Sequence, residues 1–149
     1  MIDDLRELYQ ELIVEHSSRP RNCTRPAGAN RSAKGHNPLC GDQVEVYLVL
    51  EDGLVKDVGF QGKGCAISLA SASLMTEALK GKSVDEVRAL FERFRRLVTG
   101  KDDSTAPDLD RLMALSGVRS FPVRVKCATL PWYALVAALE GDADRVTTD

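Results

Sequence analysis

The stretch QVEVYLVLEDGLVKDVGF, residues 43–60, decides the fold of this chain. In its first part, residues 43–50, apolar side chains alternate with Glu45 and Tyr47, which is typical of a strand with one buried face. Asp52-Gly53 is a strong hairpin signal, and residues 54–60 are predicted to return as a second strand. Because two strands are not stable alone in water, we expect helices to cover one face of this hairpin.

Helical patterns flank the predicted hairpin on both sides. An amphipathic helix is expected over residues 2–18, with His16 on its surface side. Ser83 and Glu86 form a capping box that opens another helix toward Gly100. Further helices are predicted at residues 66–79, at about 107–116 before Gly117, and from about Pro131, which suits a first helical turn, to Gly141. Loops or extended segments are expected at residues 19–39, 61–64, 101–107 and 121–125.

Length and composition fit one globular domain over residues 1–149. Hydrophobic residues make up 44% and charged residues 28%, which excludes a disordered chain. A formal charge of −2 excludes non-specific nucleic-acid binding through the overall field. No apolar run approaches the ~20 residues of a membrane helix, and the first residues are acidic, unlike a signal peptide. We therefore expect a cytoplasmic protein with no membrane or nucleic-acid partner, and a frayed tail at residues 142–149.

The cysteines carry the strongest chemical signal in the sequence. There are four of them: Cys23, Cys40, Cys65 and Cys127. In a reducing compartment such thiols are more often metal ligands or reactive groups than disulfides. None belongs to a Cys-x-x-Cys pair, which excludes zinc-finger and thioredoxin-type spacings. The fold must therefore bring these cysteines together if they share a site.

The surroundings of three cysteines point to a metal. Cys40 and Asp42 are two residues apart, so in an extended segment their side chains project to the same side. A thiolate beside a carboxylate is repelled unless a cation lies between them. Cys65 follows a glycine loop and precedes a helix, where backbone N–H groups favour the thiolate. Cys127 is expected in a similar position, just before the last helix. Three thiols and one carboxylate suit a tetrahedral zinc site.

Alternatives stay open for several residues near this predicted site. Buried cysteines are also common as small hydrophobic residues. Cys23 lies in a basic loop, residues 19–34, and has no ligand beside it. His36 is close in sequence to Cys40 and is a weaker candidate ligand. Three cations could offset the negative charge of the ligands: Lys63, Arg124 and Lys126.

Three motifs, in this order, resemble the signatures of the IscU/NifU-N/SufU family of iron–sulfur cluster biogenesis. They are GHNPLCGD at residues 35–42, GKGCAIS at residues 62–68 and RVKCATLxW at residues 124–132. Two details are similar to the SufU branch. Lys126 stands where IscU-type scaffolds carry a histidine, and the long interval between the second and third motifs holds a helical insertion at about residues 92–118. The LPPVK segment of scaffold-type proteins is degenerate here, with SFPVR at residues 120–124.

The resemblance implies an α+β fold, a single domain with a small antiparallel β-sheet covered by helices (SufE/NifU-like). It also implies one zinc ion per chain, with a ligand set of Cys40, Asp42, Cys65 and Cys127. The implied activity is sulfur relay, in which a SufS-type cysteine desulfurase passes persulfide sulfur to Cys40. Arg124 and Lys126 would be the cationic neighbours of this acceptor. In such a relay the chain is a transferase partner of the desulfurase and not a stand-alone enzyme.

A second function stays open on the same residues. The chain could be a scaffold on which a [2Fe–2S] or [4Fe–4S] cluster is assembled and transferred to apo-proteins. Thiolates are the usual cluster ligands and a carboxylate can complete the set, so the ligands do not separate the two functions. In the relay, sulfur would pass on to a SufBCD-type scaffold or to apo iron–sulfur proteins. The basic loop at residues 19–34 is a candidate docking surface for an acidic desulfurase.

Overall fold

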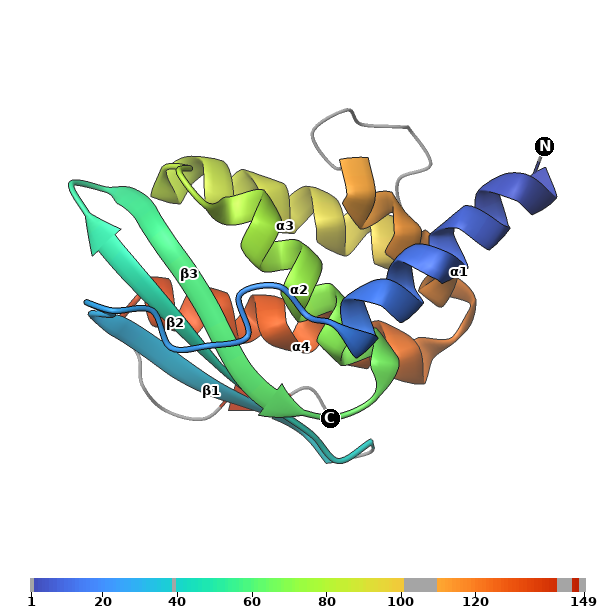
Figure 1. Cartoon of the computed structure of the whole chain (residues 1–149), viewed down its shortest axis with the longest axis horizontal. Helices are drawn as coiled ribbons and strands as arrows, with labels where there is room; N and C mark the ends of the chain where they lie inside the picture. The colour runs from blue at the N-terminus through green and yellow to red at the C-terminus, as the bar shows by residue number, and fades with distance from the viewer. Residues whose placement is uncertain (1, 39, 101–109, 142–145, 148–149) are drawn as a thin grey trace.

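A β-sheet with helices packed on one face forms the body of the molecule (Figure 1). The computed structural model describes residues 2–38, 40–100, 110–141 and 146–147. In chain order the elements are α1 (Ile2–Ser18), β1 (Arg31–Asn37), β2 (Asp42–Glu51), β3 (Leu54–Lys63), α2 (Ala66–Leu79), α3 (Val84–Thr99), the 3₁₀ helix η1 (Asp110–Ser120), α4 (Pro122–Leu139) and β4 (Val146–Thr147).

The predicted hairpin forms one half of the sheet. β2 and β3 pair antiparallel, and the turn between them has positive φ at both Asp52 (53°) and Gly53 (74°), as a type I′ turn requires. β1 pairs antiparallel with the other side of β2, and the short β4 pairs parallel with β1. The strand order is β3-β2-β1-β4. The predicted α+β fold with a small antiparallel sheet is therefore confirmed.

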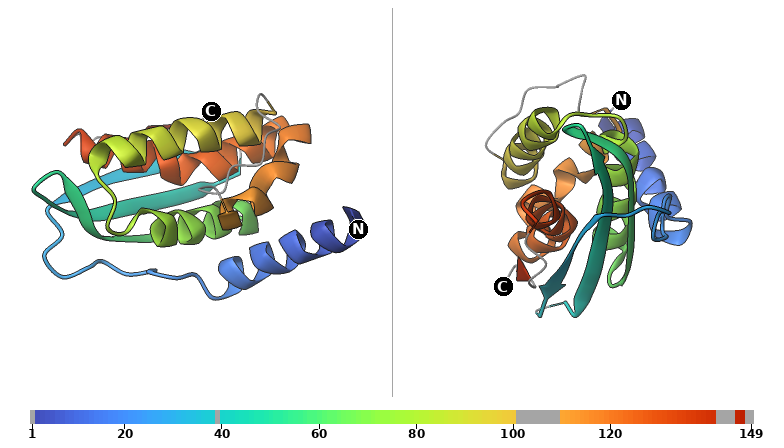
Figure 2. Two further views of the ribbon diagram at one scale, coloured as in Figure 1. Left: turned by 90° about the horizontal axis from the view of Figure 1, so that it is seen from above. Right: turned by 90° about the vertical axis from the view of Figure 1, so that its left-hand side faces the viewer.

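The core lies between the sheet and α4, and both views of Figure 2 show α3 and α4 on the same side of the sheet. Alternate strand residues are buried on this face: Val46, Leu48, Val58 and Phe60. At Gly35 an added Cβ would lie 2.9 Å from the Leu130 side chain, so the glycine lets α4 approach β1. Trp132 of α4 stacks on Phe94 of α3 with ring centres 4.6 Å apart, which joins the two helices.

α2 and α3, the two helices that directly follow the hairpin, match the prediction, whereas one residue of α1 does not. α2 has the predicted bounds, and α3 begins at the capping box of Ser83 and Glu86 and ends before Gly100. The prediction that His16 lies on the surface was wrong, because its side chain is fully buried between α1 and α2. Its Nδ1 is 2.7 Å from Oγ of Ser73, a partner that local sequence does not reveal.

Two segments that were expected to be loops are strands. Residues 31–37 form β1, whose buried side chains on the inner face are small or polar: Ala33, Gly35 and Asn37. Such residues produce no hydrophobic alternation, so the strand is invisible to the pattern that found β2. The glycine loop expected at residues 61–64 is also shorter, because residues 61–63 continue the pairing of β3 with β2.

The C-terminal helices differ from the prediction as well. η1 continues past Gly117 to Ser120, and residues 121–125, which were expected to be extended, lead into α4. α4 begins at Pro122 and not near Pro131. Both prolines carry the same sequence signal for a first helical turn. Pro131 lies inside α4, where burial of the surrounding apolar side chains outweighs the roughly 3 kcal/mol that an interior proline costs.

Some predictions concern residues outside the described part of the chain. They are the polar loop at residues 101–107, part of the insertion at about residues 92–118, and most of the tail at residues 142–149. Within that tail, Val146 and Thr147 pair with β1. In the described part of the chain, each helix is too short or too polar to cross a membrane.

Candidate metal centre

Cys40 and Asp42 lie at the junction of β1 and β2, at the end of the sheet where β3 stops and α2 begins (Figure 1). Gly41 between them has φ of 72°, a conformation that favours glycine. Asp42 is fully buried as the first residue of β2, whereas Cys40 is exposed. The ligand atoms of Cys40, Asp42 and Cys127 all lie within 4.8 Å of one another. The fold thus brings the first and third motifs together.

Cys127 lies in the second turn of α4 and is 1% exposed. The prediction that it precedes the last helix was wrong, because α4 begins at Pro122. Its Sγ is 3.3 Å from Sγ of Cys40. Burial is the main cause that raises the pKa of the Cys127 thiol, with hydrogen bonds to Cys40 and Asp42 adding to it. A metal cation bound to this thiol would act in the opposite direction and favour the thiolate.

Cys65 is the N-cap residue of α2, as the sequence predicted, and it is half-buried. Its backbone N–H donates a hydrogen bond of 2.8 Å to Oδ1 of Asp42. Its Sγ is 3.8 Å from Oδ2 of the same carboxylate. Cys65 is not among the three residues whose ligand atoms all lie within 4.8 Å of one another. It contacts the cluster through Asp42.

The carboxylate of Asp42 decides what the cluster can hold. The described residues supply no ion pair for it, although it is fully buried. A buried carboxylate without an opposite charge costs several kcal/mol. A cation shared with the neighbouring thiols would remove this cost. Two thiols and a carboxylate, with a third thiol beside them, are ligands that suit Zn²⁺ or iron, so the residues fit a metal.

Asn37 belongs to the cluster, although the sequence analysis did not select it. It is the last residue of β1 and is fully buried. Its Nδ2 is 3.5 Å from Oδ2 of Asp42 and 3.5 Å from Sγ of Cys127. The sequence feature that could have identified Asn37 is its position three residues before Cys40, within the first motif. Because side chains alternate along a strand, His36 projects to the opposite face, and the described cluster does not include this alternative ligand.

The two predicted cationic neighbours lie in different environments, and of the two Arg124 lines the pocket that contains the thiols. Arg124 is exposed, and its guanidinium carbon is 4.8 Å from the centre of the Phe121 ring. Lys126 is half-buried on α4, directly before Cys127. Cys23 is exposed in the segment between α1 and β1, and it is not one of the described residues that form the cluster.

Two arginines of the basic loop, residues 19–34, contact other parts of the protein. Arg21 forms an ion pair of 3.1 Å with Glu15 of α1. Arg25 lies over the ring of Tyr47 on the outer face of the sheet, 5.4 Å from its centre. The loop therefore contributes to packing as well as to surface charge.

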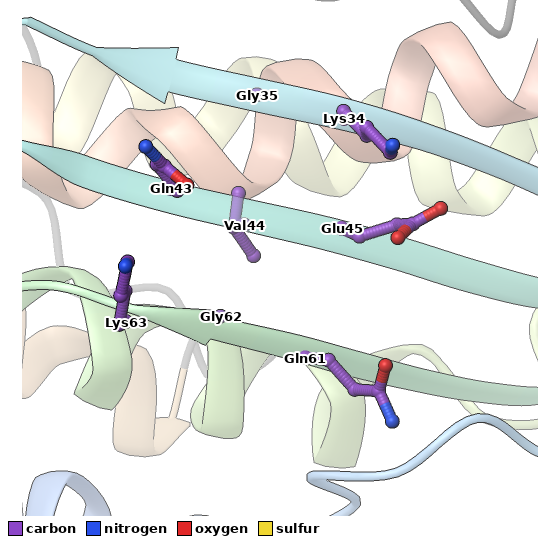
Figure 3. A pocket seen from close by; sticks show the side chains of 8 residues that line it. All are labelled: Lys34, Gly35, Gln43, Val44, Glu45, Gln61, Gly62 and Lys63. Carbon is purple, nitrogen blue, oxygen red and sulfur yellow. The ribbon is translucent and has the colours of Figure 1, made fainter.

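The three thiols of the motifs open into one surface pocket. Its volume is about 630 Å³, and its cysteines are Cys40, Cys65 and Cys127. Exposed Phe121 and Val123 form part of the wall at the start of α4. A second pocket, of about 370 Å³, lies on the outer face of the sheet among polar side chains such as Lys34, Glu45 and Gln61 (Figure 3). No cysteine is among the described residues that line this second pocket.

Comparison with known proteins places this arrangement in a family. The family model described as NifU-like N terminal domain matches residues 8–128. This chain belongs to the NifU-like N-terminal domain family. It is 41% identical over 143 residues to the zinc-dependent sulfurtransferase SufU of Bacillus subtilis (strain 168), across 93% of this chain and 95% of that protein. It is 36% identical over 143 residues to the iron–sulfur cluster assembly scaffold protein IscU of Streptococcus pyogenes serotype M1, across 96% and 89%.

Solved structures of NifU-like proteins share the fold. A protein described as an iron–sulfur cluster assembly scaffold for the SUF system of Fervidobacterium islandicum AW-1 has a TM-score of 0.81 and 32% identity, covering 87% of this chain and 94% of that one. The N-terminal domain of a NifU-like protein from Brucella abortus has a TM-score of 0.82 and 25% identity, covering 93% and 96%. The predicted membership in the IscU/NifU-N/SufU family is confirmed.

Proposed function

We propose that this chain is a zinc-dependent sulfurtransferase of iron–sulfur cluster assembly, which accepts persulfide sulfur from a SufS-type cysteine desulfurase. The position of Cys40 carries the proposal. Its thiol is exposed on a turn, and its Sγ is 3.3 Å from the buried Cys127. A partner's persulfide can reach such a thiol while the buried groups hold the metal. The 41% identity to the sulfurtransferase SufU of Bacillus subtilis supports the same function.

The proposed zinc ligands come from three separate segments of the chain. They are Cys40, Asp42, Cys65 and Cys127, for one ion per chain. The short distances among the first, second and fourth of these support the set, and Cys65 Sγ lies 3.8 Å from the carboxylate of Asp42. When bound, zinc keeps coordinating thiols deprotonated, against the burial that raises the pKa of Cys127.

The transfer step balances within the two partners. The Cys40 thiolate attacks the terminal sulfur of the donor persulfide. The sulfur–sulfur bond of the donor breaks as a new one to Cys40 forms, and the donor cysteine leaves as a thiolate. The proton of the persulfide stays with the transferred sulfur. Because one sulfur–sulfur bond replaces another, the oxidation state of this sulfur is unchanged and no external oxidant or reductant is needed. Arg124, which lines the same pocket, and Lys126 would stabilise the anionic sulfur atoms.

The partner would approach the pocket that contains the three thiols. Residues 120–124 form one wall of that pocket, and their sequence SFPVR departs from LPPVK. We therefore expect sulfur relay here and not chaperone-driven cluster release. A SufBCD-type scaffold or an apo iron–sulfur protein would then receive the sulfur, in the cytoplasm.

The alternative is a scaffold that assembles a [2Fe–2S] or [4Fe–4S] cluster on the same ligands. One observation supports it: the chain is 36% identical to the scaffold protein IscU of Streptococcus pyogenes across 96% of its length. Three thiols and a carboxylate also suit a cluster. The two functions therefore differ in the cargo that the site carries and not in the residues of the site.

Desulfurase turnover tests the proposed function. The zinc-loaded chain is mixed with a SufS-type desulfurase and cysteine, alanine formation is measured, and persulfide on the chain is detected by mass spectrometry. We expect faster turnover with the wild type and no stimulation with Cys40→Ser. Cys23→Ser is the matched control, because Cys23 is exposed and lies outside the cluster. A wild type that neither stimulates turnover nor carries persulfide would refute the proposal, and an active Cys40→Ser would refute only the acceptor assignment.

The metal that copurifies separates the two functions. Colourless protein with one zinc ion per chain supports the relay. Brown, oxygen-sensitive protein with visible absorbance supports the scaffold. Metal analysis and an absorbance spectrum of freshly purified protein give this answer before any assay.

A further inference from the structure

We propose that Asn37 is a positioning residue of the metal centre, whose side-chain amide holds Asp42 and Cys127 in the orientation that metal binding requires. The inference rests on the proposed metal site. It concerns how the ligands are supported and goes beyond which residues are ligands.

The first observation is that one amide group joins ligands from two different elements. Nδ2 of Asn37 is 3.5 Å from Oδ2 of Asp42 and 3.5 Å from Sγ of Cys127. Asn37 and Asp42 also pair directly in the register of β1 and β2. The side chain of Asn37 therefore extends from the last strand pair toward α4, where Cys127 is located.

The second observation is burial. Asn37 is fully buried on the inner face of β1. An amide in such a place costs free energy unless its hydrogens are used. The Asp42 carboxylate and the Cys127 sulfur are the acceptors in these contacts, so the buried amide is directed at two of the proposed ligands.

The third observation is that the carboxylate of Asp42 is held from both sides. Its Oδ1 accepts the backbone N–H of Cys65 at 2.8 Å, while its Oδ2 faces the amide of Asn37. The two contacts fix the rotation of the carboxylate between β1 and the start of α2. Outer-shell partners of this kind orient metal ligands, and their loss typically weakens metal binding by roughly 10–100-fold. Asparagine provides the donors without adding a charge to the cluster.

Asn37→Leu is the sharpest test. Leucine fills nearly the same volume without polar atoms, and each acceptor keeps another contact: Oδ2 of Asp42 lies 3.8 Å from Sγ of Cys65, and Sγ of Cys127 lies 3.3 Å from Sγ of Cys40. We expect the metal-free variant to unfold within a few degrees of the wild type. We expect its zinc affinity, measured by competition with a chromophoric chelator, to be roughly 10–100-fold weaker.

A spectroscopic readout separates positioning from a structural role. In the Co²⁺-loaded full chain, the thiolate-to-cobalt absorption band reports the electron density on the ligand sulfurs. Loss of the hydrogen bond to Cys127 is expected to shift this band in Asn37→Leu at saturating Co²⁺. Asn30→Ala is the matched control, because Asn30 is an exposed asparagine that hydrogen-bonds the backbone of Leu50 away from the thiols. Its zinc affinity and cobalt spectrum are expected to equal those of the wild type.

The outcomes are distinguishable from those for the proposed function. If the wild type binds no zinc, the proposed function itself fails. If the wild type binds zinc and Asn37→Leu matches its affinity within about twofold with an unshifted cobalt band, only the role of Asn37 is refuted. Asn37→Ser, which retains one donor, is the second variant. If both variants fail to fold while Asn30→Ala folds, Asn37 is a folding residue and the proposal is overturned.

Discussion

The backbone at Gly64 packs closely against the carboxylate of Asp42. A Cβ added at Gly64 would come within 2.4 Å of Oδ1 of Asp42 and 2.8 Å of Oγ of Ser68. A glycine is needed here because the backbone approaches the carboxylate this closely. From the sequence, Gly64 was predicted only to belong to a glycine loop.

Gly64→Ala is expected to displace the carboxylate of Asp42, because a carbon atom cannot lie 2.4 Å from an oxygen. Overpacking of this kind is expected to lower the free energy of unfolding by about 1–3 kcal/mol. The zinc affinity is expected to fall roughly 10–100-fold. Denaturant titration and chelator competition measure the two effects. Gly117→Ala is the control, because its added Cβ meets no surrounding atom within 4 Å. Equal losses at both glycines would contradict this explanation.

At the scale of elements, one buried ring joins α1 to α2. Nδ1 of His16 is 2.7 Å from Oγ of Ser73, and the same Oγ accepts the backbone N–H of Arg21 at 2.7 Å. Nε2 of the ring has no hydrogen-bond partner among the described residues, and Oε1 of Glu77 lies 3.5 Å from it. The packing of α1 therefore depends on a histidine, the side chain whose ordinary pKa lies closest to neutral pH.

Stability is expected to fall as the pH drops below about 6.5, the usual pKa of histidine. Burial lowers the pKa of His16 in the folded state, Arg111 and Arg21 lower it further, and Glu77 and Glu15 oppose them. The unfolded chain therefore takes up a proton at a pH where the folded chain does not. The stabilisation is present above pH 6.5 and is lost as the pH falls toward the lowered pKa.

Thermal unfolding between pH 8 and pH 5 measures this effect. The unfolding temperature of the wild type is expected to fall more steeply below about pH 6.5 than that of His16→Asn, which cannot titrate. The comparison isolates His16, because all other titratable groups are common to both proteins. Parallel curves would show that His16 contributes nothing to the pH dependence.

At the scale of the whole molecule, the candidate metal centre joins segments that are far apart in the chain. The β1–β2 turn, the start of α2 and the second turn of α4 all meet there. A bound ion would link these segments in the folded state only, so its binding free energy adds to the free energy of unfolding.

Removal of the metal is therefore expected to destabilise the whole fold. At a free zinc concentration 100 times the dissociation constant, the stabilisation would be about 2.7 kcal/mol. Denaturant unfolding with saturating zinc and with excess chelator measures the difference. Cys65→Ser and Cys127→Ser are expected to lose the zinc-dependent part, and Cys23→Ser is expected to keep it. An unfolding midpoint that is the same with zinc and with chelator would refute a stabilising metal.

The segments that the sequence predicted correctly are those whose turn and capping residues lie within a few positions of one another. The β2–β3 hairpin follows from the alternation of residues 43–50 and from Asp52-Gly53. α3 follows from its capping box and from the glycine at its end. β1 was missed because its inner side chains are small where α4 packs over them. The start of α4 was misplaced because Pro122 and Pro131 carry the same signal, and only packing chooses between them.

The sequence by itself determined the family, the hairpin with its helices, and the thiols and carboxylate that are candidate ligands, because these depend on residue type and on short spacings. Only the tertiary structure decided that Cys127 is buried within α4, that Cys40 is exposed beside it, and that Asn37 contacts both Asp42 and Cys127. Those relations join residues up to 90 positions apart. They depend on how α4 packs on β1, a contact that no local pattern in the sequence encodes.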